Sequence, residues 1–222
     1  MNKMEHMEIK KLVISMSLPI IISMVIQALY NIVDSIFVAK ISSDALTAVS
    51  LCYPVQTIIV AIACGTAVGF NTLLARYLGE KKFDYANNTM MHGILLGFLN
   101  GLVFLVLGFL FSNTFLSWFT RDVQILGLAN TYIRICTMFS FSVFVQIIFE
   151  RIMQATGNAI YNMVMQGAGA IINIILDPIM IFGWFGLPRM GVTGAAIATV
   201  IGQFCGMMIG YWITKKKIDT LE

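Results

Sequence analysis

The sequence predicts an all-α membrane protein, a bundle of six transmembrane helices. Hydrophobic residues make up 59% of the 222 residues and charged residues only 11%, whereas soluble domains are typically about 45–50% apolar and about 25% charged. Six apolar segments each reach the length of about 20 residues that a helix needs to cross a bilayer. Lys and Arg concentrate in alternate connections between these segments. We therefore expect lipid around the chain, and a formal net charge of only +3 predicts no nucleic-acid partner.

The six expected spans follow one another closely and form a single lobe over residues 1–222. They are residues 12–39, 46–78, 85–112, 123–150, 158–185 and 191–214. The connections carry the Gly, Ser, Asn or Pro residues that end helices, so consecutive helices should be antiparallel neighbours. Several spans exceed the minimum length, which predicts tilted or bent helices.

The basic residues between the spans predict the orientation of the chain. Ten Lys and Arg residues fall on the side of the two termini and three on the other side, with Arg134 inside a span. The ten are Lys3, Lys10, Lys11, Arg76, Lys81, Lys82, Arg151, Lys215, Lys216 and Lys217, and the three are Lys40, Arg121 and Arg189. By the positive-inside rule both termini are cytoplasmic. The expected location is the cytoplasmic membrane, which the chain crosses several times.

A polar stripe runs along the first span. Ser23, Gln27, Asn31 and Asp34 are separated by four, four and three residues, which returns to one face of a helix. Such a stripe should face protein or water rather than lipid. Pro19 precedes the stripe and removes a backbone hydrogen bond, so we expect either a hinge that bends this helix or a static kink.

The third and sixth spans carry glycine at every fourth position. Such ladders let helix backbones approach closely within a membrane, and we interpret them as packing surfaces. The glycines are Gly93, Gly97 and Gly101 in the third span and Gly202, Gly206 and Gly210 in the sixth. Between these spans, the fourth ends at Glu150 and Arg151, which we interpret as anchors that reach cytoplasmic water, with a functional role as the alternative.

The fifth and sixth spans carry the second group of polar residues. Gln166, Asn173 and Asp177 are seven and four residues apart in the fifth span, and Thr199 and Gln203 are four apart in the sixth. Each spacing keeps its members on one helix face. These faces should meet the polar stripe of the first span.

Asp34 and Asp177 are the clearest functional candidates, because ionisable groups inside spans are costly and usually functional. They should lie at comparable depth in the extracellular half. Two carboxylates in one low-dielectric pocket cannot both stay charged at low cost, so we expect them to exchange protons or to bind a monovalent cation. The alternative is that each aspartate only ties helices together. The candidates for lining a substrate cavity beside them are Gln27, Tyr30, Asn31, Gln166 and Gln203.

Several stretches resemble the multidrug and toxic compound extrusion (MATE) family of transporters. The family's first helix and following loop are similar to LPIIISMVIQALYNIVDSIFVAKISSDALTAVSL, which includes Pro19 and Asp34. Its fifth and sixth helices are similar to INIILDPIMIFG and GVTGAAIATVIGQ, and its two cytoplasmic loops to ARYLGEKK and ERIMQATGN. The resemblance covers nearly the whole chain.

The resemblance implies one lobe of a two-lobe MATE-type antiporter that exports amphipathic or cationic organic compounds in exchange for sodium ions or protons. It implies a cation site, for sodium or a proton, at Asp34, Asn173, Asp177 and Thr199, and a first helix that bends and straightens at Pro19. No other cofactor and no enzymatic activity are expected. Because the family has two such lobes, we expect either a fragment of a longer protein or a half-transporter that pairs with a second copy.

Three other functions stay open as alternatives. Flippases of lipid-linked precursors share the superfold but tend to have a strongly basic cavity, whereas Arg134 is the one basic residue deep in a span here. Intramembrane aspartyl proteases also use two aspartates, but their Tyr-Asp and Gly-x-Gly-Asp motifs differ from Val33-Asp34 and Leu176-Asp177. A non-catalytic assembly protein would keep its activity without either aspartate.

Overall fold

The computed structural model describes residues 7–218, which are helical apart from short connections. The elements in chain order are α2 (Ile9–Ala39), α3 (Ser43–Gly79), α4 (Phe83–Ser117), α5 (Val123–Met138), α6 (Phe141–Ala155), α7 (Ile160–Phe182), the 3-10 turn η1 (Trp184–Gly186) and α8 (Val192–Ile218). No strand occurs among these residues, so the predicted all-α class is confirmed. Lys3 and the side chain of Lys217, which contribute to the predicted orientation, lie outside the described part of the chain.

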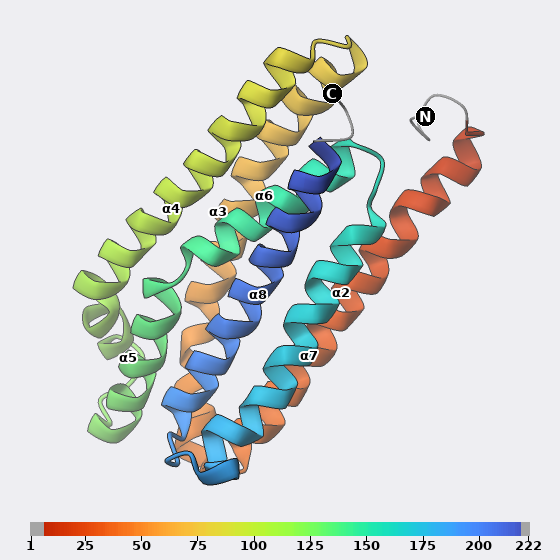
Figure 1. The fold of residues 1–222 in the computed structure, drawn as a ribbon. Helices are drawn as coiled ribbons and strands as arrows, with labels where there is room; N and C mark the ends of the chain where they lie inside the picture. The colour runs from red at the N-terminus through yellow and green to blue at the C-terminus, as the bar shows by residue number, and fades with distance from the viewer. Residues whose placement is uncertain (1–6, 219–222) are drawn as a thin grey trace.

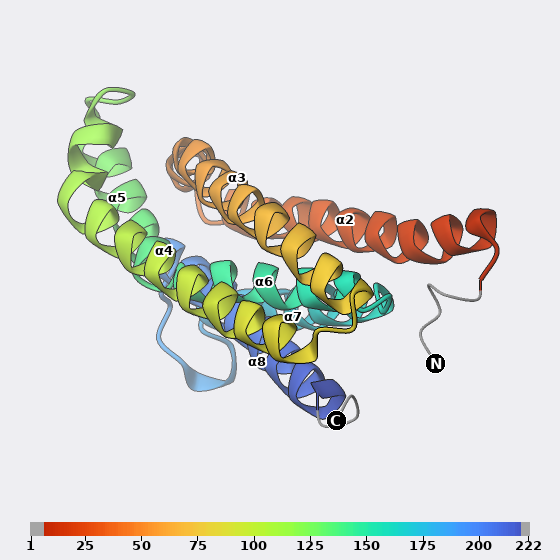
Figure 2. The same ribbon diagram turned by 90° about the horizontal axis from the view of Figure 1, so that it is seen from above.

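Counting α5 and α6 as one bent span, consecutive spans run antiparallel along the bundle (Figure 1). The α3–α4 and α6–α7 connections lie at the same end as the start of α2 and the end of α8. The α2–α3, α4–α5 and α7–α8 connections lie at the opposite end, and the α5–α6 break lies partway along the bundle. Seen from above, α2 and α3 lie along one side of the bundle and α8 along the other, with α6 between them (Figure 2). α7 packs against both α2 and α8, so the three spans with predicted polar faces are neighbours.

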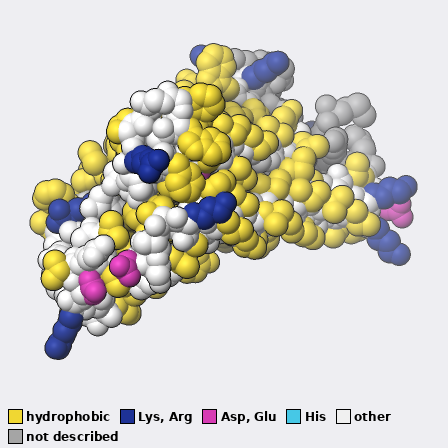
Figure 3. Space-filling model, turned by 90° about the horizontal axis from the view of Figure 1, so that it is seen from below, with side chains coloured by type: hydrophobic (Ala, Val, Ile, Leu, Met, Phe, Trp, Pro, Cys, Tyr) yellow, Lys and Arg dark blue, Asp and Glu magenta, His cyan; other side chains and the backbone are white. Residues whose placement is uncertain are grey.

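The helices are long and apolar enough for a membrane. α2, α3, α4, α7 and α8 each satisfy this condition alone, and α5 and α6 satisfy it together. Large hydrophobic side chains are exposed on the outside, such as Ile32 at 56% and Phe109 at 68%. Figure 3 shows hydrophobic side chains over a broad continuous area of one face. The chain is a multi-pass membrane protein whose outer surface suits lipid.

The span predicted at residues 123–150 is a broken helix rather than one continuous element. α5 and α6 are bent by 47° at the break between them. Thr137 Oγ1 and Ser140 Oγ each donate a hydrogen bond of 2.8 Å to a carbonyl of the preceding turn, and such bonds bend helices. α4 also approaches so closely that a Cβ on Gly101 would overlap the backbone of Phe141. The bend therefore follows from local hydroxyl groups and from tight packing.

Two predicted helix ends are corrected. α4 continues to Ser117 instead of ending at residue 112. α7 ends at Phe182, because Gly183 adopts a left-handed conformation with φ of 75°, which stops a helix. α2 runs unbroken through Pro19, so the proline does not interrupt it, and a hinge at this position stays a prediction.

Two apolar clusters hold the bundle together. The first lies toward the end with the α3–α4 connection and includes Leu74, Phe144 and Ile148. The second lies toward the opposite end and includes Tyr132 and Ala196. Because these clusters join α3 to α4, α5, α6 and α8, they fix the helices that form one side of a polar cavity.

Candidate functional site

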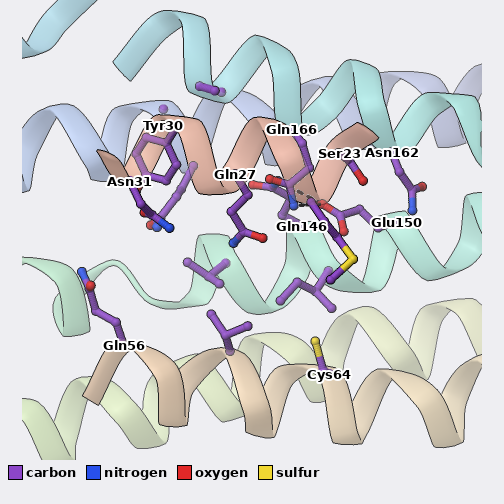
Figure 4. Close-up of a pocket in the computed structure, with 18 of the residues that line it drawn as sticks. Ser23, Gln27, Tyr30, Asn31, Gln56, Cys64, Gln146, Glu150, Asn162 and Gln166 are labelled. Carbon is purple, nitrogen blue, oxygen red and sulfur yellow. Dashed lines mark hydrogen bonds between the residues drawn. The ribbon is translucent and has the colours of Figure 1, made fainter. Parts of the chain in front are cut away.

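A cavity of about 530 Å³ lies between α2, α3, α6, α7 and α8 (Figure 4). Its wall includes every residue predicted as a cavity candidate, namely Gln27, Tyr30, Asn31, Gln166 and Gln203. Asn173 and Thr199 line it as well, whereas Asp34 and Asp177 are not among the lining residues. The two carboxylates therefore lie behind a wall that presents amide and hydroxyl groups to the cavity.

The four predicted cation-site residues lie together. Asp34 is 7% exposed and Asp177 is fully buried, and their charges are close enough to interact. Asn173 Nδ2 is 3.4 Å from both Asp177 Oδ1 and Thr199 Oγ1. With its amide turned over, Asn173 donates to Asp177 Oδ2 at 3.2 Å and accepts from the Thr199 N–H at 3.1 Å. In either orientation Asn173 links α7 to α8 in front of the carboxylates.

The local sequence explains why these side chains converge. Asn173 and Asp177 are one turn apart in α7 and share a face. Glycines allow α7 and α8 to meet backbone to backbone, since a Cβ on Gly202 would lie 2.7 Å from the Gly169 carbonyl oxygen. This approach brings Thr199 of α8 alongside Asn173. The glycine ladder of the sixth span is thus a packing surface, as predicted.

Asp34 retains an unused binding group. Its Oδ1 is buried and has no hydrogen-bond partner among residues 7–218. A buried carboxylate oxygen without a donor is costly unless a positive charge lies beside it. Tyr30, one turn before Asp34 in α2, lines the cavity. The donor set is therefore rich in oxygen, which fits a hard monovalent cation or a proton.

Glu150 is a cavity residue that the sequence reasoning assigned to the membrane surface. It lines the cavity, and its Oε1 accepts hydrogen bonds from Gln146 Nε2 at 3.1 Å and from Gln166 Nε2 at 2.9 Å (Figure 4). The spacing of four residues between Gln146 and Glu150 is a sequence signal for the first bond. The second bond depends on how α7 folds back along α6, which no local signal reveals.

Arg151 and Asn162 complete this end of the cavity. Arg151 Nη1 donates to Gln154 Oε1 at 2.7 Å, and its Nη2 is 4.0 Å from Cys64 Sγ. Arg151 Nε and Asn162 Oδ1 are both buried without a partner in the described part of the chain. Arg151, Gln154, Cys64 and Asn162 all line the cavity. The cavity therefore has one group of polar residues near the predicted cation site and another around Glu150.

Comparison with known proteins identifies relatives of about twice the length. The MatE family model matches residues 19–179. A FAD transporter of Shewanella oneidensis is 28% identical over 214 residues, which cover 96% of this chain and 47% of the relative. A probable multidrug resistance protein NorM of Thermotoga maritima is 27% identical over 216 residues, which cover 97% of this chain and 46% of the relative.

The fold is also similar to solved structures. A crystal structure of MATE in the bent conformation superimposes with a TM-score of 0.85 and 29% sequence identity. The match covers 94% of this chain and 46% of that chain. The chain therefore spans about half the length of the relatives and of the solved structure that it matches.

Proposed function

Because this chain belongs to the MatE family of transporters, we propose that it is the amino-terminal lobe of a cation-coupled exporter. Amphipathic or cationic organic compounds leave the cell through it in exchange for sodium ions or protons. The compound binds in the cavity, and the coupling ion binds at Asp34, Asn173, Asp177 and Thr199. The observation that carries this proposal is the pair of buried carboxylates directly behind an amide-lined cavity wall.

Coupling follows from the shared wall. Asn173 and Thr199 line the cavity and also neighbour the carboxylates, so a cation held there uses groups that a bound compound would contact. Asp34 Oδ1, which has no partner among the described residues, gains one when the ion binds. An ion and a compound that compete for the same groups oppose each other's binding by the same factor. That mutual opposition is what an antiporter requires.

The cavity lining favours amphipathic cations. Amides such as Gln27 and Asn31 can form varied hydrogen bonds, and Met24 and Tyr53 add soft apolar surface. Arg151 is the one basic side chain among the described residues that line the cavity, which argues against a flippase for anionic lipid-linked precursors. The two relatives differ in the substrates that their names give, FAD and multiple drugs, so the substrate is inferred here from the lining.

We also propose that the chain ends face the cytoplasm and that a second six-helix lobe completes the cavity. The end of the bundle with the α3–α4 connection carries the basic residues Lys81 and Lys82, as the positive-inside rule requires for a cytoplasmic face. A wall of amides facing lipid would lack hydrogen-bond partners. The second lobe is either the carboxy-terminal half of a longer protein or a second copy of this chain.

Everted membrane vesicles that contain the complete two-lobe protein test the proposal. A sodium or proton gradient should drive accumulation of ethidium, and ethidium should in turn dissipate the gradient. Asp34→Asn and Asp177→Asn should each abolish this coupling, whereas Glu80→Gln, in the exposed turn after α3, should not. Accumulation that is independent of both gradients would refute cation coupling.

A further inference from the structure

The Glu150 end of the cavity is distant from the cation site. Gln166, which donates to Glu150, precedes Asp177 by eleven residues in α7. At about 1.5 Å of rise per residue this places the two groups roughly 16 Å apart along the helix. A single bound ion cannot bridge that distance, so the Glu150 group needs its own explanation.

The Glu150 carboxylate is held with one oxygen available to a ligand. Its Oε1 accepts from Gln146 of α6 and Gln166 of α7, at 3.1 and 2.9 Å. Within residues 7–218 no hydrogen bond to Oε2 is present. Because two helices hold the same oxygen, the carboxylate is oriented before any ligand arrives, and less conformational entropy is lost on binding.

Asn162 supplies an independent observation at the same place. It is 2% exposed, lines the cavity and lies at the same end as Glu150 (Figure 4). It precedes Gln166 by four residues, so both side chains share a face of α7. Its Oδ1 is buried with no donor in the described chain, and a buried carbonyl oxygen left without a hydrogen bond is unfavourable. A ligand that donates a hydrogen bond would remove this cost.

We propose that this end of the cavity is a second binding subsite for a protonated amine that carries at least one N–H group. Glu150 Oε2 and Asn162 Oδ1 accept hydrogen bonds from the ammonium group, and the apolar body of the compound lies along Ile59 and Ile147, which line the same cavity. The inference rests on the proposed export of amphipathic cations and adds which part of the compound is recognised, and where. Arg151, beside Glu150, repels a second positive group, so the compound carries one ammonium at this end.

The test compares the binding of two probes of equal charge to membranes that contain the complete two-lobe protein. The probes are 4-phenylbutylamine, which is protonated at neutral pH, and its N,N,N-trimethyl derivative, which has no N–H group. The wild type should bind the amine about tenfold more tightly, because a hydrogen bond to a charged group contributes about that factor. Glu150→Gln should weaken amine binding about tenfold and reduce the difference between the probes.

Further variants separate the subsite from misfolding. Asn162→Ala should reduce the preference for the amine, and Glu80→Gln, in the exposed turn after α3, should preserve it. Equal binding of both probes by the wild type overturns the subsite. A preference that stays at the wild-type value in Glu150→Gln or, if that variant does not reach the membrane, in Asn162→Ala overturns it as well. Gradient-driven export of the trimethyl probe without amine preference would refute the proposed subsite but not the proposed export. Amine preference without gradient-driven export would refute the proposed export but not the subsite.

Discussion

Replacing Gly202 with alanine should separate α7 from α8 and weaken ion binding at the proposed cation site. The new Cβ would lie 2.7 Å from the Gly169 carbonyl oxygen and 3.2 Å from Asn173 Cβ. Ordinary contacts between carbon and a carbonyl oxygen are about 3.3–3.6 Å, so the two helices would have to move apart by roughly 0.6–0.9 Å. Because one obstacle is backbone and the other a Cβ, no side-chain rotation can relieve the overlap.

The expected magnitude of the Gly202→Ala effect combines two opposing terms. Overpacking of this kind costs about 1–3 kcal/mol, and the higher helix propensity of alanine offsets at most about 1 kcal/mol. We therefore expect the free energy of unfolding to fall by about 1–2 kcal/mol. The Asn173–Thr199 contact, already 3.4 Å long, would be lost. A neutral hydrogen bond contributes about 1 kcal/mol, so the affinity for the coupling ion should fall roughly fivefold.

Thermal unfolding of the complete protein in mild detergent, with and without the coupling ion, measures both quantities. Gly127→Ala in α5 is the matched control, because nothing lies within 4 Å of a Cβ at that position. It should be neutral or slightly stabilising. If Gly202→Ala unfolds at the wild-type temperature and keeps the full response to the ion, the argument from the α7–α8 contact is refuted.

Other substitutions probe the proposed cation site and the turn after α3. Asp34→Asn, like Asp177→Asn, should abolish coupled transport in vesicles, because it removes a charge that serves ion exchange. Expression should stay nearly intact, because a charged side chain buried in the membrane costs folding free energy; wild-type export would contradict this. Asn173→Ala and Thr199→Ala should lower ion affinity by about tenfold at most, because each removes one neutral ligand; a direct ion titration measures the loss. Hydrogen bonds from Lys82 and from the guanidinium one turn before Glu80 lower the pKa of Glu80 from 4.5 to about 2. A folded-state pKa below the unfolded one stabilises the protein above about pH 4.5, and this contribution is lost as the pH falls toward 2. Glu80→Gln should therefore reduce the pH dependence of the free energy of unfolding between about pH 4.5 and 2. An unchanged pH profile would count against the hydrogen bonds to Glu80.

Much of the fold could be predicted from the sequence because apolar length and helix periodicity are local properties. The expected spans match helices to within a few residues at most ends, and the spacing of Asn173 and Asp177 already places them on one face. The cavity candidates Gln27 and Asn31 line the same cavity for the same reason. Pairwise contacts between helices are different, because they depend on packing that no single helix encodes.

The break between α5 and α6 shows this dependence. No Pro or Gly lies at residues 139–140, so the usual breakers are absent from the sequence there. The bend arises because Thr137 and Ser140 bond to the backbone while Gly101 of α4 leaves room for the backbone of Phe141. The hydroxyl bonds are local, whereas Gly101 is distant in sequence from the bend. Without knowledge of the contact between Gly101 and Phe141, the position of the bend could not be predicted.

Glu150 likewise has surroundings that depend on tertiary packing. From the sequence, an acidic residue beside Arg151 at the end of a span can reach water and needs no partner within the bundle. In the structure α6 continues to Ala155, so Glu150 lies more than one turn inside the helix and faces a cavity. Gln166 of the returning helix then lies opposite it and donates to it. An acidic group placed inside a membrane bundle, oriented by two amides and left with one open oxygen, is costly unless it is used. Glu150, whose surroundings depend on tertiary packing, is therefore the residue for which the structure supports a proposal that helix periodicity could not.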